Sequence, residues 1–284
     1  MGSYHRPATL EEALEVLADA SAIIAAGCTD LFAATDRQAL VGPVLDITGI
    51  SALKRIEVTP AHIRIGAAAS WADIIRADLP AGFDMLKQAA SEVGSVQIQT
   101  AATVAGNICN ASPAADGVPC FLALEAEVEI ASIRRRRSLP LDQFLIGVRQ
   151  TALAPDEMVT ALLIPQAAAA GRSCFLKLGA RKYLVISIAM VAARLEIEEG
   201  VITRAALAVG ACSAVATRLP RLEAALVGQP LAAGAGLVSE PLMADDLSPI
   251  DDIRADAPYR RHAAIELLRR ALNELAMATK GQAA

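Results

Sequence analysis

Two stretches of small and turn-forming residues are the parts of this sequence best suited to bind a ligand. The first, Ala-Ala-Gly-Cys-Thr-Asp at 25–30, follows an apolar run at 22–26 that predicts a short buried strand. The second, Thr-Val-Ala-Gly-Asn at 103–107, lies in a longer run of small residues at 100–125. Small side chains let a backbone come close to a ligand, and they leave N–H groups and hydroxyls available to an anion. Two such loops that converge can bind one pyrophosphate without an arginine.

An acid follows the second loop. Asp116 stands in sequence where a carboxylate could accept hydrogen bonds from ribose hydroxyls, as acids do in other nucleotide sites. These residues alone leave two interpretations open, a dinucleotide site and two ordinary tight turns in an α/β domain.

The motifs of other chemistries are missing. The sequence has no G-x-S-x-G, no Walker loop and no G-x-G-x-x-G, and its 3 histidines are far apart. The 5 cysteines (Cys28, Cys109, Cys120, Cys174, Cys212) form no C-x-x-C pair, so we expect free thiols and no metal or iron–sulfur ligation in this chain. We predict no catalytic residue.

Composition restricts the class of protein further. The 284 residues are 54% hydrophobic with a net charge of −5, which predicts a large aliphatic core and argues against nucleic-acid binding. No apolar run is long enough for a transmembrane helix, and the acidic N-terminal region does not resemble a signal peptide. We therefore expect a cytoplasmic protein without a transmembrane segment.

Hydrophobic periodicity and capping residues predict the elements that must position these loops. The expected helices lie at 9–19, 83–93, 119–126, 219–227 and 259–280, and a further helix that contains Trp71 is expected to open at the cap 70–73. The expected strands lie at 22–26, 44–47, 55–58, 63–67, 127–132, 158–164, 173–178, 185–195 and 201–209, and 96–99 is expected to be extended. The four arginines at 134–137 predict a solvated hairpin turn, with a contact to an acidic partner as the alternative.

Several motifs in chain order resemble one known family, the FAD-binding subunits of the molybdenum hydroxylases. They are Y-x-x-P-x-T-L-E-E-A-L at 4–14, A-A-G-C-T-D-L at 25–31, T-V-A-G-N at 103–107, N-A-S-P-A-A-D at 110–116, P-x-x-x-A-L-x-A at 119–126, D-x-F-L-x-G-x-R-x-T-x-L-x-P-D-E at 142–157, F-L-K-L-G-A-R at 175–181 and E-A-A-L-V-G-Q-P-L at 223–231. That family includes the medium subunit of carbon monoxide dehydrogenase and the flavin part of xanthine dehydrogenase.

The resemblance implies an α+β fold. A PCMH-type FAD-binding domain of two small α/β subdomains would span 1–168, divided near 52–55. A C-terminal α+β domain of the carbon monoxide dehydrogenase flavoprotein type, a sheet covered by helices, would span 169–284.

The resemblance also implies a set of FAD-binding residues. The segment 24–31 would wrap the pyrophosphate, 103–107 would complete the cradle, Asp116 would bind on the ribose and adenine side, Val159 would line the adenine end, and Lys177 would lie near the flavin. The residues so assigned are Ile24, Ala25, Ala26, Gly27, Cys28, Thr29, Asp30, Leu31, Thr103, Ala105, Gly106, Asn107, Asp116, Val159 and Lys177. Cys28 and Ala105 replace family glycines, and Val185 stands where many members have an acid.

The implied function is electron transfer through FAD bound in this chain. The molybdenum cofactor and the [2Fe–2S] clusters would belong to a molybdopterin large subunit and an iron–sulfur small subunit, in a dimer of heterotrimers. The acceptor would be NAD⁺, oxygen or a quinone. Two alternatives stay open: a scaffold or assembly subunit that has lost its flavin, and a free-standing flavin reductase or oxidase of the same fold.

Overall fold

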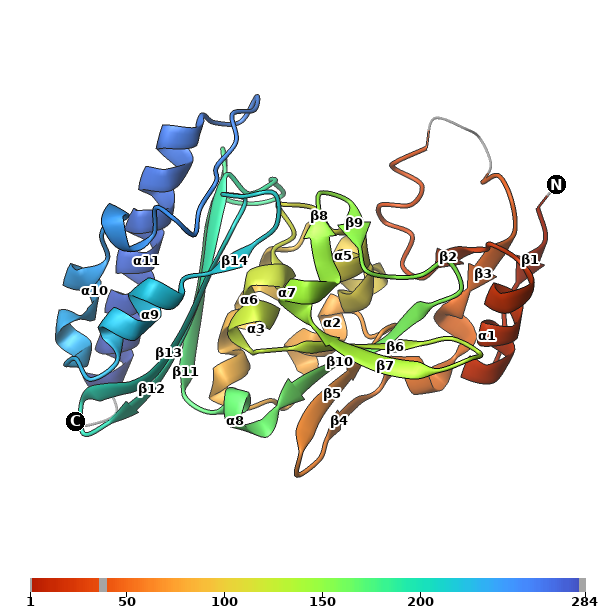
Figure 1. Ribbon diagram of the computed structural model, residues 1–284, viewed down its shortest axis with the longest axis horizontal. Helices are drawn as coiled ribbons and strands as arrows, with labels where there is room; N and C mark the ends of the chain where they lie inside the picture. Colours follow the sequence, from red (N-terminus) through yellow and green to blue (C-terminus); the bar gives the residue numbers. More distant parts are fainter. Residues whose placement is uncertain (1, 36–39, 281–284) are drawn as a thin grey trace.

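The computed structural model describes residues 2–35 and 40–280. Three sheets follow one another along the chain, and they lie side by side from one end of the molecule to the other (Figure 1). No helix in the described ranges is both long enough and apolar enough to cross a membrane.

The N-terminal sheet is small and parallel. Its three strands, in spatial order, are β1 (Tyr4–His5), β3 (Val44–Asp46) and β2 (Ile23–Ala25). Helix α1 (Leu10–Asp19) packs on it through Ala13, Leu14 and Leu17. The helix begins at a capping box: Thr9 accepts from the Glu12 N–H, and Glu12 accepts from the Thr9 N–H. The predicted helix at 9–19 is therefore confirmed.

The middle sheet is antiparallel. Its strands, in spatial order, are β4 (Ile56–Val58), β5 (His62–Gly66), β10 (Met158–Pro165), β6 (Glu127–Ala131) and β7 (Arg136–Pro140), and a separate hairpin pairs β8 (Leu145–Gly147) with β9 (Gln150–Thr151). The helices of this part are α2 (Trp71–Arg76), α3 (Asp84–Glu92), α4 (Val96–Ala101), α5 (Val104–Asn110), α6 (Gly117–Ala123), α7 (Leu141–Phe144) and α8 (Gln166–Ala169). The proposed domain division at 168 falls inside α8.

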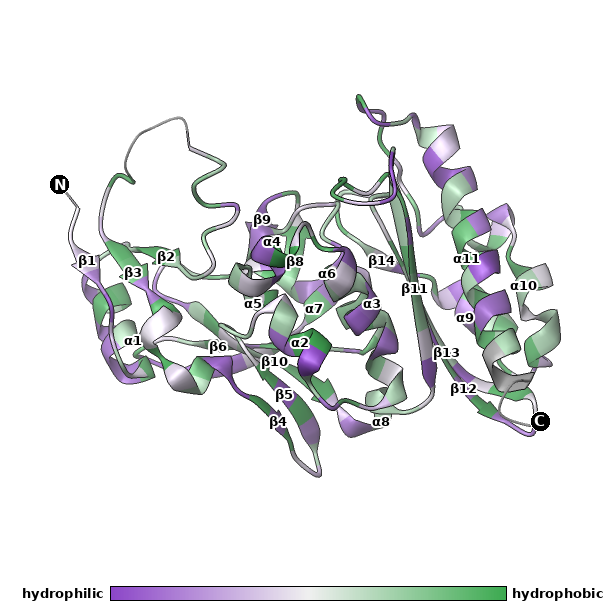
Figure 2. Ribbon diagram, turned by 180° about the vertical axis from the view of Figure 1, so that it is seen from behind, coloured by the Kyte–Doolittle hydropathy of each residue, from purple (hydrophilic) through white to green (hydrophobic). Residues whose placement is uncertain are grey.

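The C-terminal sheet has the order β11 (Arg172–Leu178), β12 (Ala189–Glu198), β13 (Val201–Gly210) and β14 (Thr217–Arg218). Helices α9 (Pro220–Leu226), α10 (Gly234–Leu237) and α11 (Ala257–Lys280) belong to the same part, and α9 and α11 contact one face of this sheet. Helices α3 and α6, from the middle of the chain, contact the other face. The strands between these two helical layers are coloured mainly as hydrophobic in Figure 2. Burial on both faces explains their long apolar runs.

Two predictions of local structure are wrong. The segment 96–99 is helical, because the Ser95 hydroxyl caps α4 by accepting from the Ile98 N–H at 3.4 Å. The strand expected from 185 begins at Ala189 instead. The residues before it form a loop in which the Ser187 hydroxyl donates to the Asp116 carboxylate at 2.6 Å.

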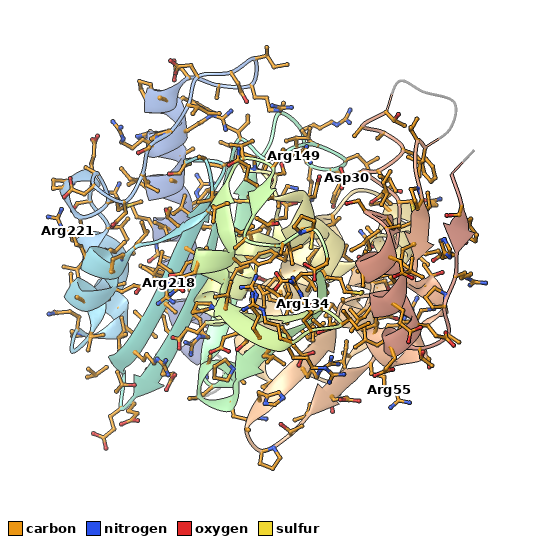
Figure 3. The ribbon with its side chains drawn as sticks, turned by 45° about the vertical axis from the view of Figure 1, so that its right-hand side comes forward. Asp30, Arg55, Arg134, Arg149, Arg218 and Arg221 are labelled. Atoms are coloured by element: carbon orange, nitrogen blue, oxygen red, sulfur yellow. The ribbon has the colours of Figure 1, made fainter. Side chains whose placement is uncertain are left out.

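The four arginines at 134–137 are paired within the chain. Arg134 pairs with Asp156, Arg136 with Glu11, and both Arg135 and Arg137 with Glu157. The β6–β7 hairpin carries them, and Figure 3 labels Arg134 on it. These pairs link the hairpin to the segment before β10 and to α1.

Candidate functional site

A cavity of about 1000 Å³ opens where three segments meet. They are the loop after β2, the stretch from the end of α3 to the start of α6, and the loop between β11 and β12. Sites for small molecules have volumes of roughly 300–1000 Å³, so this one is large enough for an extended cofactor.

Most of the site residues predicted from the sequence lie on the wall of this cavity, and Ala25 and Lys177 are the two that do not. The predicted residues on the wall are Ile24, Ala26, Gly27, Cys28, Thr29, Asp30, Leu31, Thr103, Ala105, Gly106, Asn107, Asp116 and Val159. Ala25 is buried in β2, and Lys177 is in contact with Asp116. Segments about 75 residues apart in the sequence thus form one concave surface.

The loop after β2 is held close to α4. A Cβ at Gly27 would lie 2.0 Å from the Ala101 carbonyl oxygen, so only glycine permits this approach. Cys28 has φ = 57°, a left-handed conformation that favours glycine. In the part of the chain that the structure describes, the N–H groups of Gly27, Cys28 and Thr29 have no hydrogen-bond partner. These N–H groups are available to an anionic ligand.

The second wall of the cavity is the start of helix α5. The segment 103–107 was expected to be a loop after a strand, and this expectation is wrong, because the segment begins a helix that follows another helix. Thr103 is the N-cap of α5, and its hydroxyl accepts from the Gly106 N–H at 3.1 Å. The hydroxyl proton remains available to a ligand, because accepting one hydrogen bond does not use it. Gly106 is exposed on the cavity wall.

The third wall joins two distant parts of the chain. Asp116 begins α6 without capping it; its carboxylate accepts from the Lys177 ammonium at 2.7 Å and from the Ser187 hydroxyl at 2.6 Å. Burial raises the pKa of the Asp116 carboxyl, and the Lys177 charge opposes that rise. The resemblance assigned Asp116 to the ribose and adenine side and Lys177 to the flavin side. The two side chains are in direct contact, so these two predicted residues lie next to each other.

Several cavity residues had no role in the sequence-based prediction. Arg149 is exposed at the cavity with φ = 58°, and its guanidinium donates to the Asn110 carbonyl oxygen at 3.3 Å. It is the arginine of the D-x-F-L-x-G-x-R motif, which is the signal that could have identified it. Figure 3 labels Arg149 and Asp30 on neighbouring parts of the surface. Other wall residues without a role in that prediction include 92–95, Ser112 and 184–187.

The thiols at the cavity are unreactive. Burial raises the pKa of Cys28, and it raises the pKa of Cys109 to about 12. Both are therefore protonated at neutral pH, and a thiol is a poor nucleophile. No cluster of three metal-ligating side chains occurs among the described residues. The site has binding groups, and its chemistry must come from what it binds.

One buried polar atom at the site has no partner. Asn107 lies on the cavity wall, and its Oδ1 is buried without a hydrogen bond within the described residues. A buried acceptor of this kind favours a ligand or water that donates to it.

Comparison with known proteins identifies the family. Residues 1–167 match the family described as FAD binding domain in molybdopterin dehydrogenase, and residues 175–275 match the CO dehydrogenase flavoprotein C-terminal domain. The chain therefore belongs to the FAD-binding subunits of the molybdopterin dehydrogenases, which are oxidoreductase flavoproteins. The family predicted from the sequence motifs is confirmed.

Relatives match over nearly the whole chain. The nicotinate dehydrogenase FAD-subunit of Eubacterium barkeri is 32% identical, over 92% of this chain and 91% of the relative. The xanthine dehydrogenase FAD-binding subunit of Escherichia coli O157:H7 is 30% identical, over 99% and 98%. Among solved structures, carbon monoxide dehydrogenase from Hydrogenophaga pseudoflava matches with a TM-score of 0.86 and 27% identity, over 96% of both chains. The α+β fold expected from the sequence is thereby confirmed.

Proposed function

We propose that this chain is the electron-transfer subunit of a heterotrimeric molybdenum hydroxylase. It takes electrons from the [2Fe–2S] clusters of a small partner subunit and passes them to NAD⁺, oxygen or a quinone. The observation that carries the proposal is the single cavity into which both small-residue segments, 26–31 and 103–107, open.

The residues of the cavity fit FAD. The N–H groups of Gly27, Cys28 and Thr29, which are unpaired among the described residues, and the hydroxyls of Thr29 and Thr103 suit a pyrophosphate. Buried apolar side chains at Ile47, Met158 and Val159 suit a planar ring. FAD, once bound, would accept single electrons and deliver them in pairs; the chain's own residues would bind it, orient it and limit its contact with water.

The partner subunits follow from the family. Relatives are named as FAD-subunits or FAD-binding subunits of dehydrogenases, which supports separate iron–sulfur and molybdopterin subunits here. We propose a dimer of heterotrimers. A cytoplasmic location is proposed as well, supported by five free cysteines, since disulfides are rare in the cytosol.

Purification of the chain and its visible spectrum test the proposal. We expect flavin absorption bands in the purified chain, or their retention after FAD is added and the unbound FAD is removed by gel filtration. A chain that is colourless after this step would contradict the proposal and favour the flavin-free scaffold. Turnover of NADH by the chain without partners would favour the free-standing reductase.

A pair of variants tests the location of the site. Gly106→Trp places a large side chain on the cavity wall and should abolish FAD binding. Arg135→Ala changes the β6–β7 hairpin, which contributes nothing to the cavity among the described residues, and should leave FAD binding unchanged. Full FAD binding by Gly106→Trp would mean that the cofactor binds elsewhere.

A further inference from the structure

The carboxylate of Asp116 is the point at which the C-terminal sheet and its loop are attached to the cavity. An aspartate at the start of a helix ordinarily accepts from that helix's own N–H groups. Asp116 does not cap α6, and its two oxygens are directed to Lys177 on β11 and Ser187 in the β11–β12 loop. The side chains of Asp116 and Lys177 are 9% and 8% exposed, so water screens this ion pair only weakly.

The same contact fixes a wall of the cavity. The Lys177 ammonium also donates to the Val185 carbonyl oxygen at 3.4 Å, and Ser187 is buried. Residues 184–187 line the cavity between these two anchors. Asp116 thus determines where the lysine charge lies and where residues 184–187 lie.

The residues of the cavity wall differ in their access to solvent. Ile47, Met158 and Val159 are buried, whereas Leu184 and Ile186 are 54% and 53% exposed. A redox ring must exchange electrons with molecules outside the chain, whereas the adenine of FAD need not. The exposed part of the wall, which is the loop anchored by Asp116 and Lys177, therefore suits the flavin ring.

We propose that Asp116 is a positioning residue that holds the Lys177 ammonium beside the exposed loop 184–187 and partly offsets its charge, so that the pair adjusts the midpoint potential of a flavin bound against that loop. This inference rests on the proposed function. Reduction of the flavin by two electrons from a chemical reductant, with one proton from solvent, leaves the ring one unit more negative. An uncompensated positive charge nearby therefore favours the reduced form, and removal of that charge disfavours it.

The test uses the full chain with FAD and measures the midpoint potential by dithionite titration. Asp116→Asn keeps an acceptor for Lys177 but removes the negative charge, and should raise the potential. Lys177→Met should lower it. We expect each variant to change the ratio of the dissociation constants for oxidised and reduced FAD by about tenfold, equivalent to about 30 mV for a two-electron couple.

The double variant Asp116→Asn/Lys177→Met is the matched control. It removes both charges and should return the potential to near the wild-type value, which a purely structural role would not do. Shifts of the two single variants in the same direction, or no shift in either, would overturn the inference. Should Asp116→Asn fail to fold, an unchanged potential in Lys177→Met overturns it alone.

These outcomes are distinct from failure of the proposed function. A wild-type chain that binds no FAD refutes the function. FAD binding with potentials that these variants do not alter refutes only the role of Asp116 and Lys177.

Discussion

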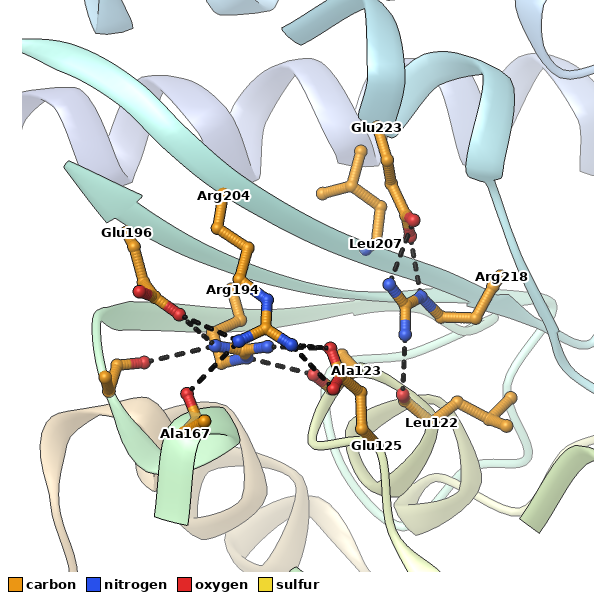
Figure 4. A network of polar contacts seen from close by, with 11 residues as sticks. Leu122, Ala123, Glu125, Ala167, Arg194, Glu196, Arg204, Leu207, Arg218 and Glu223 are labelled. Carbon is orange, nitrogen blue, oxygen red and sulfur yellow. Dashed lines mark hydrogen bonds and ion pairs between the residues drawn. The ribbon is translucent and has the colours of Figure 1, made fainter. Parts of the chain in front are cut away.

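Two clusters of polar and charged residues join the C-terminal sheet to the middle part of the chain. Only one of them lies at the cavity. The first surrounds Arg194 on β12, whose guanidinium donates to the carbonyl oxygens of Ala123 and Ala170 and to Glu125 and Glu196 (Figure 4). The second is the Asp116–Lys177–Ser187 cluster. Residues of the Arg194 cluster contribute nothing to the cavity within the described ranges, whereas Asp116 and Ser187 line it.

The difference concerns how each cluster uses its hydrogen-bonding capacity. Arg194 is 1% exposed, and its fixed carbonyl and carboxylate acceptors engage all three nitrogens. Burial lowers the pKa of Arg194, and the Glu125 charge opposes that. Asp116, which lines the cavity, instead accepts two hydrogen bonds from side chains, and a carboxylate has roughly four acceptor positions. One cluster is complete by itself, and the other has capacity left for a ligand.

The largest expected effect is on stability, at the Arg194 cluster. Arg194→Met leaves the carbonyl oxygen of the buried Ala123 and the carboxylate of Glu125 without this donor and should lower the free energy of unfolding by about 3 kcal/mol. Urea unfolding measures it. Arg270→Met, which breaks an exposed pair with Glu266, is the control and should change stability by about 0.5 kcal/mol or less. A tenfold loss of FAD affinity in the folded Arg194→Met protein would contradict the separation of the two clusters.

FAD itself should stabilise the chain by a similar amount. At a free concentration of 100 times its dissociation constant, a ligand of the folded state adds about 2.7 kcal/mol. We expect the same increment for wild type and for Arg194→Met in thermal or urea unfolding, because the cavity is intact in both. Gly106→Trp should gain nothing. A smaller increment in Arg194→Met would mean that its cluster supports the cavity after all.

Local signals in the sequence predicted much of the fold and part of the site. The capping boxes at Thr9 and Ser70 lie within three residues of their partners, and both helices begin where those pairs predict. The segment 103–107 was predicted as part of the site from its small residues alone. Its helical state was missed because Thr103 was interpreted as a loop residue and not as an N-cap.

Contacts between distant residues could not be predicted in this way. Asp116 is 61 residues from Lys177 and 71 from Ser187, and nothing local to any of them indicates the others. The β-branched residues near 185 favour a strand, yet the bond from Ser187 to Asp116 keeps this segment a loop. Tertiary structure overrides local propensity where the site is assembled.

The ion pair between Arg137 on β7 and Glu157, just before β10, can be compared with these two clusters. Hydrogen bonds from Arg137 hold the pKa of Glu157 at about 2, below its ordinary value of about 4.5. The unfolded carboxyl binds more protons between these values, so stability is full above pH 4.5 and falls as the pH drops toward 2. After allowance for solvent screening, the loss should be about 1–2 kcal/mol.

Unfolding measured between pH 5 and pH 3 checks this, with Glu157→Gln as the control. The glutamine variant should be less stable at pH 5 and should lack this part of the pH dependence. The same acid dependence in the variant would assign it to other carboxylates. The pH dependence, if observed in the wild type alone, would show that the Arg137–Glu157 pair stabilises the folded chain without a ligand, as the Arg194 cluster does.

The smallest effect is expected at Cys28, where the cavity carries backbone strain that the regular strand around Arg194 does not. A side chain at φ = 57° costs about 1 kcal/mol, and glycine removes that cost but loses more backbone entropy on folding. Cys28→Gly should therefore raise the free energy of unfolding by about 0.5 kcal/mol, with FAD affinity unchanged because the N–H group remains. Cys28→Ala keeps the Cβ and loses only the thiol, which donates to the Ala26 carbonyl oxygen at 3.5 Å, and should gain nothing. Equal gains in both variants would assign the effect to the half-buried thiol and not to backbone strain at this position.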